Sequence, residues 1–146
     1  MQNNISTFLW FDTQAGDAAK MYCEIFPDAK ITSTSPMSTS FAIGDQRFIA
    51  FNGGPHYKLT PAVSVFVSCK NQEEVDAVWN RFLAAGGSEH KCGWLVDKYG
   101  LSWQIIPTQL LELMTDPDPE KANRVVQAML QMQKIDVAAL QRAHRG

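Results

Sequence analysis

The spacing of apolar residues predicts the same order of elements twice along the chain. The run from Ile5 to Phe11 is almost wholly apolar and predicts a buried strand, and Asp12-Thr13 after it is typical of a helix N-cap. Apolar residues then recur at steps of three and four until Pro27-Asp28, which predicts an amphipathic helix. Three short strands are predicted next, at Ala29 to Ser35, Met37 to Ile43 and Gln46 to Phe51. The first part of the chain therefore predicts a β-α-β-β-β unit.

The same pattern begins again after the loop 52–61, which carries two glycines and two prolines. Ala62 to Cys69 predicts a buried strand, and Asn71 with Glu74 three residues later predicts the start of a helix that ends at Gly86-Gly87. Short strands are predicted at Glu89 to Cys92, Trp94 to Lys98 and Leu101 to Ile106. The apolar positions of the two predicted helices match at a constant shift, which indicates an internal repeat of two β-α-β-β-β units.

The last segment, 108–146, has a different pattern. Asp118 followed by Pro119 is typical of a helix start, and apolar residues recur after it at helical spacing. A second short helix is predicted after Asp136. The charges of this helical hairpin cancel, so we expect it to pack on its own domain or on a partner subunit rather than on a membrane.

Composition narrows the class of protein without naming a function. The chain has 146 residues, of which 45% are hydrophobic and 19% charged, with a net charge of −2. We therefore expect one globular domain, 1–146, built from a first module 1–54, a second module 62–107 and C-terminal helices 108–146. Binding to nucleic acid or membranes is disfavoured, and the lack of a signal-peptide pattern predicts a cytoplasmic protein. Three cysteines without a CxxC motif argue against a disulfide framework and against a zinc ribbon.

Four ordered motifs carry a family resemblance. They are Asn52-Gly53-Gly54-Pro55, Cys92-Gly93-Trp94-Leu95, the stretch from Asp97 to Gln104, and the stretch from Asp116 to Ala122. They resemble the PhnB-like family, also described as demethylubiquinone methyltransferase-like, of the vicinal oxygen chelate superfamily that includes glyoxalase I and the bleomycin resistance proteins. The resemblance implies an α+β fold of two paired β-α-β-β-β modules with mixed, curved sheets. It also implies a homodimer, with the tail helices crossing to the partner.

Metal-dependent members of that superfamily hold one divalent ion between His and Glu side chains on facing strands. The resemblance places Gln104, Thr7 and Phe48 or a neighbour at three of these positions. The first strand of the second module, Ala62 to Cys69, offers no imidazole or carboxylate. One neutral amide is too weak a ligand set, so we predict no metal. The glycines form no GxGxxG motif either, which disfavours literal methyl transfer from a nucleotide donor, and no cofactor is expected.

Three side chains are candidates for acid–base or nucleophilic chemistry, each with a structural alternative. Cys92 lies near Lys91 and Lys98, which favour a reactive thiolate, yet free cysteine is commonly a small buried apolar residue. His56 in the glycine-rich loop is a candidate proton shuttle or an exposed loop residue. Asp97 is a candidate acid or base, or the residue that caps the turn after it.

The remaining candidates would bind a ligand rather than react with it. If the face of the last strand that carries Gln104 lines a cup, its amide is able to hydrogen-bond a ligand or to satisfy itself within the cavity. Candidate lining residues are Trp10, Phe48, Asn52, Trp94 and Trp103. The sequence thus favours a metal-free, homodimeric, small-molecule-binding protein. The alternative is an enzyme acting on a small aromatic or dicarbonyl compound, as a lyase, a dioxygenase-like enzyme or a methyltransferase.

Overall fold

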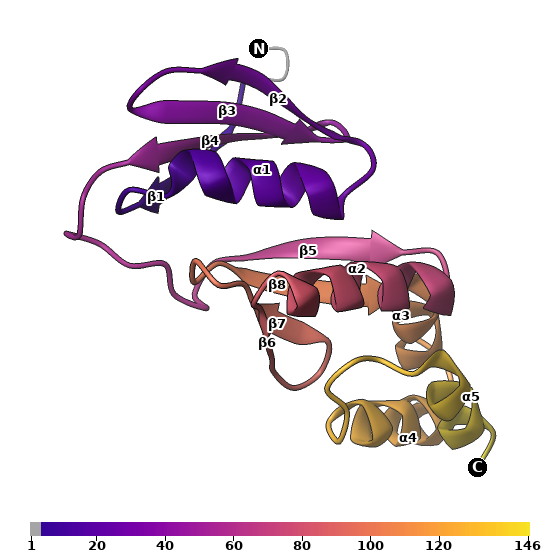
Figure 1. Ribbon diagram of the computed structural model, residues 1–146. Coiled ribbons are helices and arrows are strands. Elements are labelled where there is room, and N and C mark those ends of the chain that lie inside the picture. The colour runs from indigo at the N-terminus through magenta and orange to yellow at the C-terminus, as the bar shows by residue number, and fades with distance from the viewer. Residues whose placement is uncertain (1–3) are drawn as a thin grey trace. The chain divides into compact units, whose positions relative to one another are not determined.

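The computed structural model describes residues 4–146 and divides the chain into two compact units, 1–60 and 61–146. The boundary falls inside the glycine-rich loop where the sequence pattern begins again. Each unit contains a four-stranded mixed sheet with one helix on it, as Figure 1 shows. The predicted repeat of two β-α-β-β-β modules is therefore confirmed.

The first unit has the strand order β1-β4-β3-β2, with β1 parallel to β4 and the other neighbours antiparallel. Its elements are β1 (Thr7–Phe11), α1 (Ala15–Ile25), β2 (Ala29–Thr34), β3 (Ser38–Ile43) and β4 (Gln46–Asn52). The apolar stripe of α1 is buried against the sheet, where Tyr22 contacts Phe41, and Phe41 stacks on Phe48 with ring centroids 4.9 Å apart. This packing is the core of the first unit.

The start of α1 differs from the sequence prediction. Gln14 rather than Thr13 is the N-cap residue, and its side chain makes no capping hydrogen bond. Instead the side-chain oxygen of Asn52, at the end of β4, accepts a hydrogen bond of 2.8 Å from the backbone N–H of Ala15. A distant residue thus satisfies one of the free N–H groups of the first turn, which local sequence spacing does not reveal.

The second unit repeats the topology with the order β5-β8-β7-β6, and β5 is parallel to β8. Its elements are β5 (Ser64–Cys69), α2 (Gln72–Ala84), β6 (Ser88–Glu89), β7 (Trp94–Val96) and β8 (Ser102–Pro107). The predicted cap of α2 is confirmed, because the Asn71 side chain accepts from the N–H of Glu74 at 3.0 Å. The Glu74 carboxylate in turn accepts from the N–H of Lys70 at 2.8 Å, which completes a capping arrangement.

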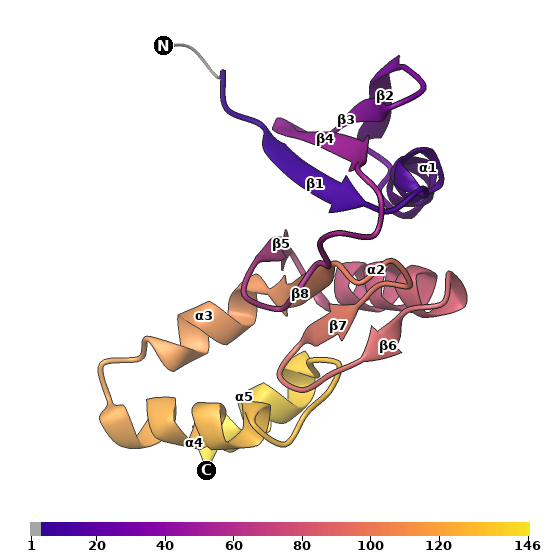
Figure 2. The same ribbon diagram turned by 90° about the vertical axis from the view of Figure 1, so that its left-hand side faces the viewer.

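Three helices follow β8 and belong to the second unit. They are α3 (Thr108–Met114), α4 (Pro119–Met129) and α5 (Val137–Arg145). The N-caps predicted at Asp118 and Asp136 are confirmed by their side-chain hydrogen bonds, whereas α3 was not predicted. Figure 2 shows the three helices gathered beyond the end of β8.

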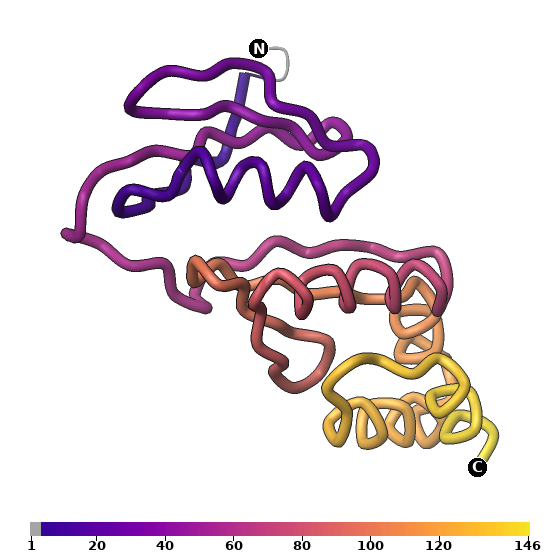
Figure 3. Tube along the Cα trace, in the orientation of Figure 1, coloured from indigo at the N-terminus to yellow at the C-terminus, as the bar shows by residue number. Residues whose placement is uncertain are grey.

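The tail helices pack on the second unit of their own chain, and that they also reach a partner subunit stays a prediction. Their core joins β8, and its buried members are Ile106, Leu110, Val125, Ile135 and Leu140. The amide of Gln72 in α2 donates to the carbonyl of Ile135 at 2.9 Å and accepts from the N–H of Val137 at 2.7 Å. The loop between α4 and α5 passes the loop before β7, where the N–H groups of Cys92 and Gly93 donate to Met132 and Gln133 (Figure 3).

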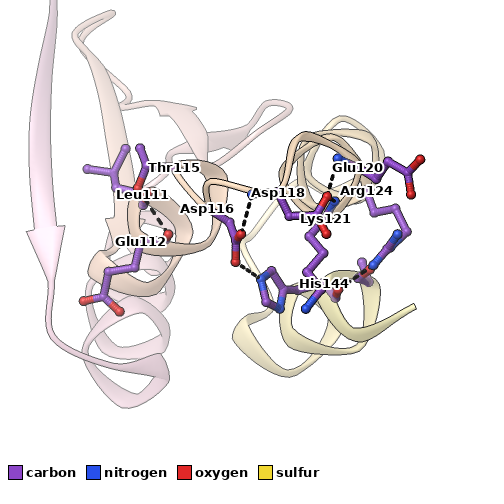
Figure 4. A network of polar contacts seen from close by, with 10 residues as sticks. Leu111, Glu112, Thr115, Asp116, Asp118, Glu120, Lys121, Arg124 and His144 are labelled. Atoms are coloured by element: carbon purple, nitrogen blue, oxygen red, sulfur yellow. Dashed lines mark hydrogen bonds and ion pairs between the residues drawn. The ribbon is translucent and has the colours of Figure 1, made fainter.

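A contact between two side chains joins α5 to the segment just before α4. The Asp116 carboxylate lies 2.7 Å from Nε2 of His144, and its other oxygen accepts from the N–H of Asp118 at 2.8 Å (Figure 4). Arg124 donates to the carbonyls of Ala143 and His144 at 2.8 Å. The N–H of Asp118, and after it the His144 ring, lowers the pKa of Asp116 below its ordinary value. The end of α5 is therefore tied to the start of α4.

Because this pKa is lowered, the difference in stability between the wild type and Asp116→Asn should depend on pH. A carboxyl whose pKa is lowered in the folded state adds stability above its unfolded pKa of about 3.9 and loses it as the pH falls through the folded value. We expect the variant to melt slightly below the wild type at pH 7. Thermal unfolding followed by circular dichroism should show this difference vanish below the folded pKa of Asp116, and a difference that persists there would contradict the assignment.

Candidate functional site

The sheet of the first unit has one face against α1 and one face away from it. Side chains alternate along β1, so Leu9 and Phe11 are buried against the helix, whereas Phe8 is 56% exposed and Trp10 is half-buried on the opposite face. On the neighbouring strand β4, Phe51 pairs with Trp10 in register and lies on this same face. The face away from α1 is therefore apolar and partly open to solvent.

Four aromatic side chains meet on this face, and we call Phe8, Trp10, Phe51 and Tyr57 the aromatic cluster. The ring of Phe51 lies 5.2 Å from those of both Phe8 and Trp10, and the ring of Tyr57 lies 4.9 Å from that of Trp10, edge to face. Tyr57 is 69% exposed. Edge-to-face rings at these distances attract each other, so the cluster holds a defined shape at the surface.

The indole of Trp10 is held in place by the loop after β4. Its Nε1 donates to the carbonyl oxygen of Gly54 at 2.9 Å. A Cβ atom at Gly53 would lie 2.3 Å from two atoms of the indole ring, so only glycine allows the ring to rest on the backbone there. The Asn-Gly-Gly-Pro motif thus supports the indole ring of Trp10. The Asn52 side chain caps α1 and does not face the cluster.

Gly53→Ala is expected to displace the indole and to destabilise the first unit by about 1–3 kcal/mol, as overpacking generally does. The matched control is Gly16→Ala in α1, where a Cβ would meet its nearest neighbour, Oγ1 of Thr39, at 3.7 Å. Alanine is the better helix former, so this control should be as stable as the wild type or more stable. Urea unfolding followed by tryptophan fluorescence measures both, and equal losses would show that Gly53 has no special role.

In the second unit Gln104 and Trp94 lie on the sheet face away from α2. They are register partners on β8 and β7, and both are half-buried. The Gln104 amide donates to Oγ of Ser64 on β5 at 3.0 Å. Gln104 therefore lies on the sheet face away from α2, next to an aromatic side chain.

Two aromatic residues predicted to line a cup lie on the opposite faces, in the cores. Phe48 is 2% exposed and stacks on Phe41, and Trp103 is 1% exposed, with its ring 4.9 Å from that of Phe82 in α2. The prediction that they are available to a ligand on the open faces is therefore corrected. Because side chains alternate along a strand, Phe48 and Trp103 face the helix while their sequence neighbours lie on the open face.

The predicted acid–base residue Asp97 holds a turn together. Its Oδ1 accepts hydrogen bonds from the N–H groups of Tyr99 at 2.8 Å and Leu101 at 3.1 Å, and its Oδ2 accepts from Trp103 Nε1 at 2.9 Å. The residue is 4% exposed. A carboxylate that serves three donors in this way is built into the fold, so we assign it a structural role.

The other two predicted reactive residues lie apart from Asp97. Cys92 precedes β7 and Asp97 follows it, so they stand at opposite ends of that strand. Cys92 is half-buried. Its backbone φ is 62°, a conformation that residues other than glycine adopt rarely. His56 belongs to the first unit, where it is exposed in the loop after Gly54. The second unit therefore does not bring its two candidates, Cys92 and Asp97, together.

Comparison with protein families and solved structures identifies the relatives of this fold. The sequence model of the family described as 3-demethylubiquinone-9 3-methyltransferase matches residues 3–106. The chain belongs to this family. It is the PhnB-like branch of the vicinal oxygen chelate superfamily, as the motifs indicated. A comparison with curated proteins gives no match.

Solved structures of similar fold come from several bacteria. A PhnB protein from Bacillus cereus, provisionally named 3-demethylubiquinone-9 3-methyltransferase, is 28% identical, with a TM-score of 0.64 over 72% of this chain and 99% of its own. A fosfomycin resistance protein, FosX, from Listeria monocytogenes, complexed with Mn(II) and sulfate, is 13% identical, with a TM-score of 0.54 over 70% and 87%. Lactoylglutathione lyase from Agrobacterium tumefaciens is 18% identical, with a TM-score of 0.50 over 71% and 92%. At these last two identities the likeness concerns the fold alone.

The strands that the structure describes carry few side chains of the kind that bind a divalent ion. In the strands of residues 4–146, the only acidic or imidazole side chain is Glu89, and it accepts a hydrogen bond from Nε1 of Trp79 at 3.0 Å. Within the described residues, no three His, Cys, Asp or Glu side chains gather at a place that could hold a metal. The predicted positions carry Thr7, Phe48 and Gln104, of which Phe48 is in the core.

Sequence reasoning found part of this site and missed part of it. Trp10 was singled out, but Phe8, Phe51 and Tyr57 were not, although alternation along β1 and β4 would have placed the first two beside Trp10. The contact of Gly53 with the Trp10 indole joins β1 to a loop that is distant in the sequence.

No helix among residues 4–146 has the length and apolar character to span a membrane.

Proposed function

We propose that this PhnB-like protein binds a small planar aromatic molecule on the aromatic cluster of its first unit, without a metal ion. The observation that carries the proposal is the fixed indole of Trp10. The ring packs against Gly53, and its N–H donates a hydrogen bond to the carbonyl oxygen of Gly54. Phe8 and Tyr57 are 56% and 69% exposed, although Phe8 packs at a tilt against Phe51 and Tyr57 packs edge to face against Trp10. Preorganised aromatic rings open to solvent favour stacking of a planar ligand.

The chemical surroundings support an apolar ligand bound by contact rather than by charge. Ile49 lies on the same face of β4 as Phe51, and the neighbouring positions of β3 carry Ser38 and Ser40. Lys30 and Arg47 are the charged residues at the described strand positions of this face. Both are exposed, and Arg47 lies near the end of β4 that is far from Gly53. Affinity would therefore come mainly from burial of ring surface, about 25 cal/mol per Å².

The binding residues can be tested with the planar, uncharged probe 2-naphthol. Tyr57→Ala removes an exposed ring that contacts Trp10, so it should lower the affinity about fivefold without impairing folding, since an aromatic pair contributes about 1 kcal/mol. The control is Ile31→Ala on the edge strand β2, which removes a side chain that is 40% exposed on the same sheet. Isothermal titration with equal affinity for both variants and the wild type would refute the proposed site.

We also propose that the protein is a homodimer and carries no metal. The paired modules support the dimer. In the strands of residues 4–146, the positions on the open faces carry no carboxylate or imidazole, which supports metal-free binding. Native mass spectrometry of protein purified without chelator should give the mass of two chains, bare or with an organic adduct. A stoichiometric divalent ion would contradict the metal-free proposal, and a monomer at micromolar concentration would contradict the dimer.

A further inference from the structure

A polar group with incomplete hydrogen bonding lies on the face of the second sheet that points away from α2. It consists of Ser64, Ser102 and Gln104, which we call the serine–glutamine cluster. Ser64 and Ser102 are register partners on β5 and β8, and Gln104 lies two residues beyond Ser102 on the same face. One hydrogen bond joins the cluster, from the Gln104 amide to Oγ of Ser64 at 3.0 Å.

The hydroxyl of Ser102 is the feature that points to a ligand. The residue is 0% exposed, and among the described residues its Oγ has no hydrogen-bond partner. Buried hydroxyl groups are nearly always paired, because an unpaired one loses its bonds to water and gains nothing in return. A partner that belongs to another molecule would resolve this imbalance.

The side chains of Gln104 and Ser64 also have hydrogen-bond donors or acceptors that no described residue uses. The Gln104 side chain has two N–H groups and a carbonyl oxygen, and its one hydrogen bond to a described residue is the one to Ser64. The Ser64 hydroxyl accepts that bond and still has its own O–H to donate. The cluster can therefore both donate to and accept from a bound group.

We propose that the serine–glutamine cluster binds an uncharged polar group of a small organic ligand, one that both donates and accepts hydrogen bonds, such as a carboxamide or a hydroxyl. The strand positions on this face of β5, β7 and β8 carry no Lys, Arg or His, so nothing there compensates a carboxylate or phosphate. Phe66, register partner of Gln104, is 48% exposed, and Trp94 flanks Gln104 on its other side. The apolar neighbours fit the ring or chain that carries the polar group.

The proposal rests on the proposed function only in that both concern a small organic ligand, because the two clusters share no residue and lie in different units. Benzamide and benzoate form the test pair, since they have the same shape and differ in charge. In ¹H–¹⁵N spectra, benzamide should shift the side-chain amide signals of Gln104, which are assigned by their loss in Gln104→Met. Benzoate should leave these signals in place.

Ser102→Ala should weaken benzamide binding about fivefold, the loss of one hydrogen bond. Its melting temperature should stay the same or rise, because the variant removes a hydroxyl that has no partner in the fold. The control, Ser68→Ala, changes an exposed serine on the same face of β5 and should bind like the wild type. Should Ser102→Ala fail to fold, Gln104→Met gives the same affinity test at the half-buried member.

Unchanged Gln104 signals together with unchanged affinity of the Ser102 and Gln104 variants would overturn the serine–glutamine cluster as a binding site. So would equal binding of benzoate and benzamide, because it would show no selection for a neutral group. The indole signal of Trp10 reports separately on the aromatic cluster in the same spectra. A shift at Trp10 without one at Gln104 refutes this inference alone, and a shift at Gln104 without one at Trp10 refutes only the proposed aromatic site.

Discussion

A chain that ends at Pro107 is expected to aggregate instead of leaving a soluble two-sheet protein. Removal of α3, α4 and α5 strips the cover from Ile106, which is 4% exposed in the intact chain, and takes away the side chains of Leu110, Val125, Ile135 and Leu140. It also removes both backbone partners of the Gln72 amide. Size-exclusion chromatography of the truncated chain should show loss of the soluble dimer or monomer peak.

Point variants separate this packing role from a general effect of shortening. Leu140→Ala, at a side chain that is 0% exposed, should lower the free energy of unfolding by about 2–5 kcal/mol. The control Leu130→Ala, at a side chain that is 42% exposed, should change it by less than about 0.5 kcal/mol. A truncated chain that stays monodisperse with a native circular dichroism spectrum would instead show that the tail is a separate interaction module.

Asp97→Ala is the second change with a large expected effect, a loss of about 3–5 kcal/mol in the stability of the second unit. The variant removes the acceptor of three N–H groups, those of Tyr99, Leu101 and the Trp103 indole. Buried donors left without a partner cost roughly 1–3 kcal/mol each. Urea unfolding followed by tryptophan fluorescence should detect the loss, since Trp103 itself changes surroundings.

The matched control is Asp45→Ala, because Asp45 follows Gly44 in the β3–β4 turn of the first unit and is exposed. An exposed turn residue should change stability by less than about 0.5 kcal/mol. If Asp97→Ala were as stable as the wild type while ligand binding or turnover was lost, the structural assignment would be wrong and the acid–base hypothesis would regain support.

The fold was largely predictable because its signals are local and repeated. Alternation and helical spacing placed the strands and the two repeat helices, and cap residues such as Asn71, Asp118 and Asp136 located helix starts, which their side-chain hydrogen bonds confirm. Helix α3 was missed because it follows β8 directly, and its N-cap, Pro107, makes no side-chain capping hydrogen bond.

The faces of the strands were harder to predict than the strands themselves. Phe48 and Trp103 are large and aromatic, as ligand-lining residues often are, yet they fill the cores beneath α1 and α2. Assigning a strand to its core or its open face requires the register with its neighbours, and a shift of one residue reverses every side chain. The parallel pairing of β1 with β4 supplies that register, and it joins segments far apart in sequence.

The candidate site was less predictable than the fold, because it depends on contacts over long sequence distances. Trp10 is fixed by Gly53 and Gly54, and Asn52 caps a helix that begins at Ala15. Likewise, only the positions of its neighbours show that the Ser102 hydroxyl has no hydrogen-bond partner among the described residues. Residue type alone predicted polar and aromatic candidates, and tertiary structure then separated those that hold the fold from those that remain open.

The most direct test of metal-free aromatic binding is a ¹H–¹⁵N titration of the protein, purified without chelator, with 2-naphthol. The indole N–H signals of Trp79 and Trp103 serve as internal controls, since these groups are bonded to Glu89 and Asp97. We predict that the Trp10 signal, assigned by its loss in Trp10→Phe, shifts in a saturable way while the two controls stay in place. A Trp10 signal that does not move when 2-naphthol is added, or that moves only when a divalent ion is also present, would contradict the central claim.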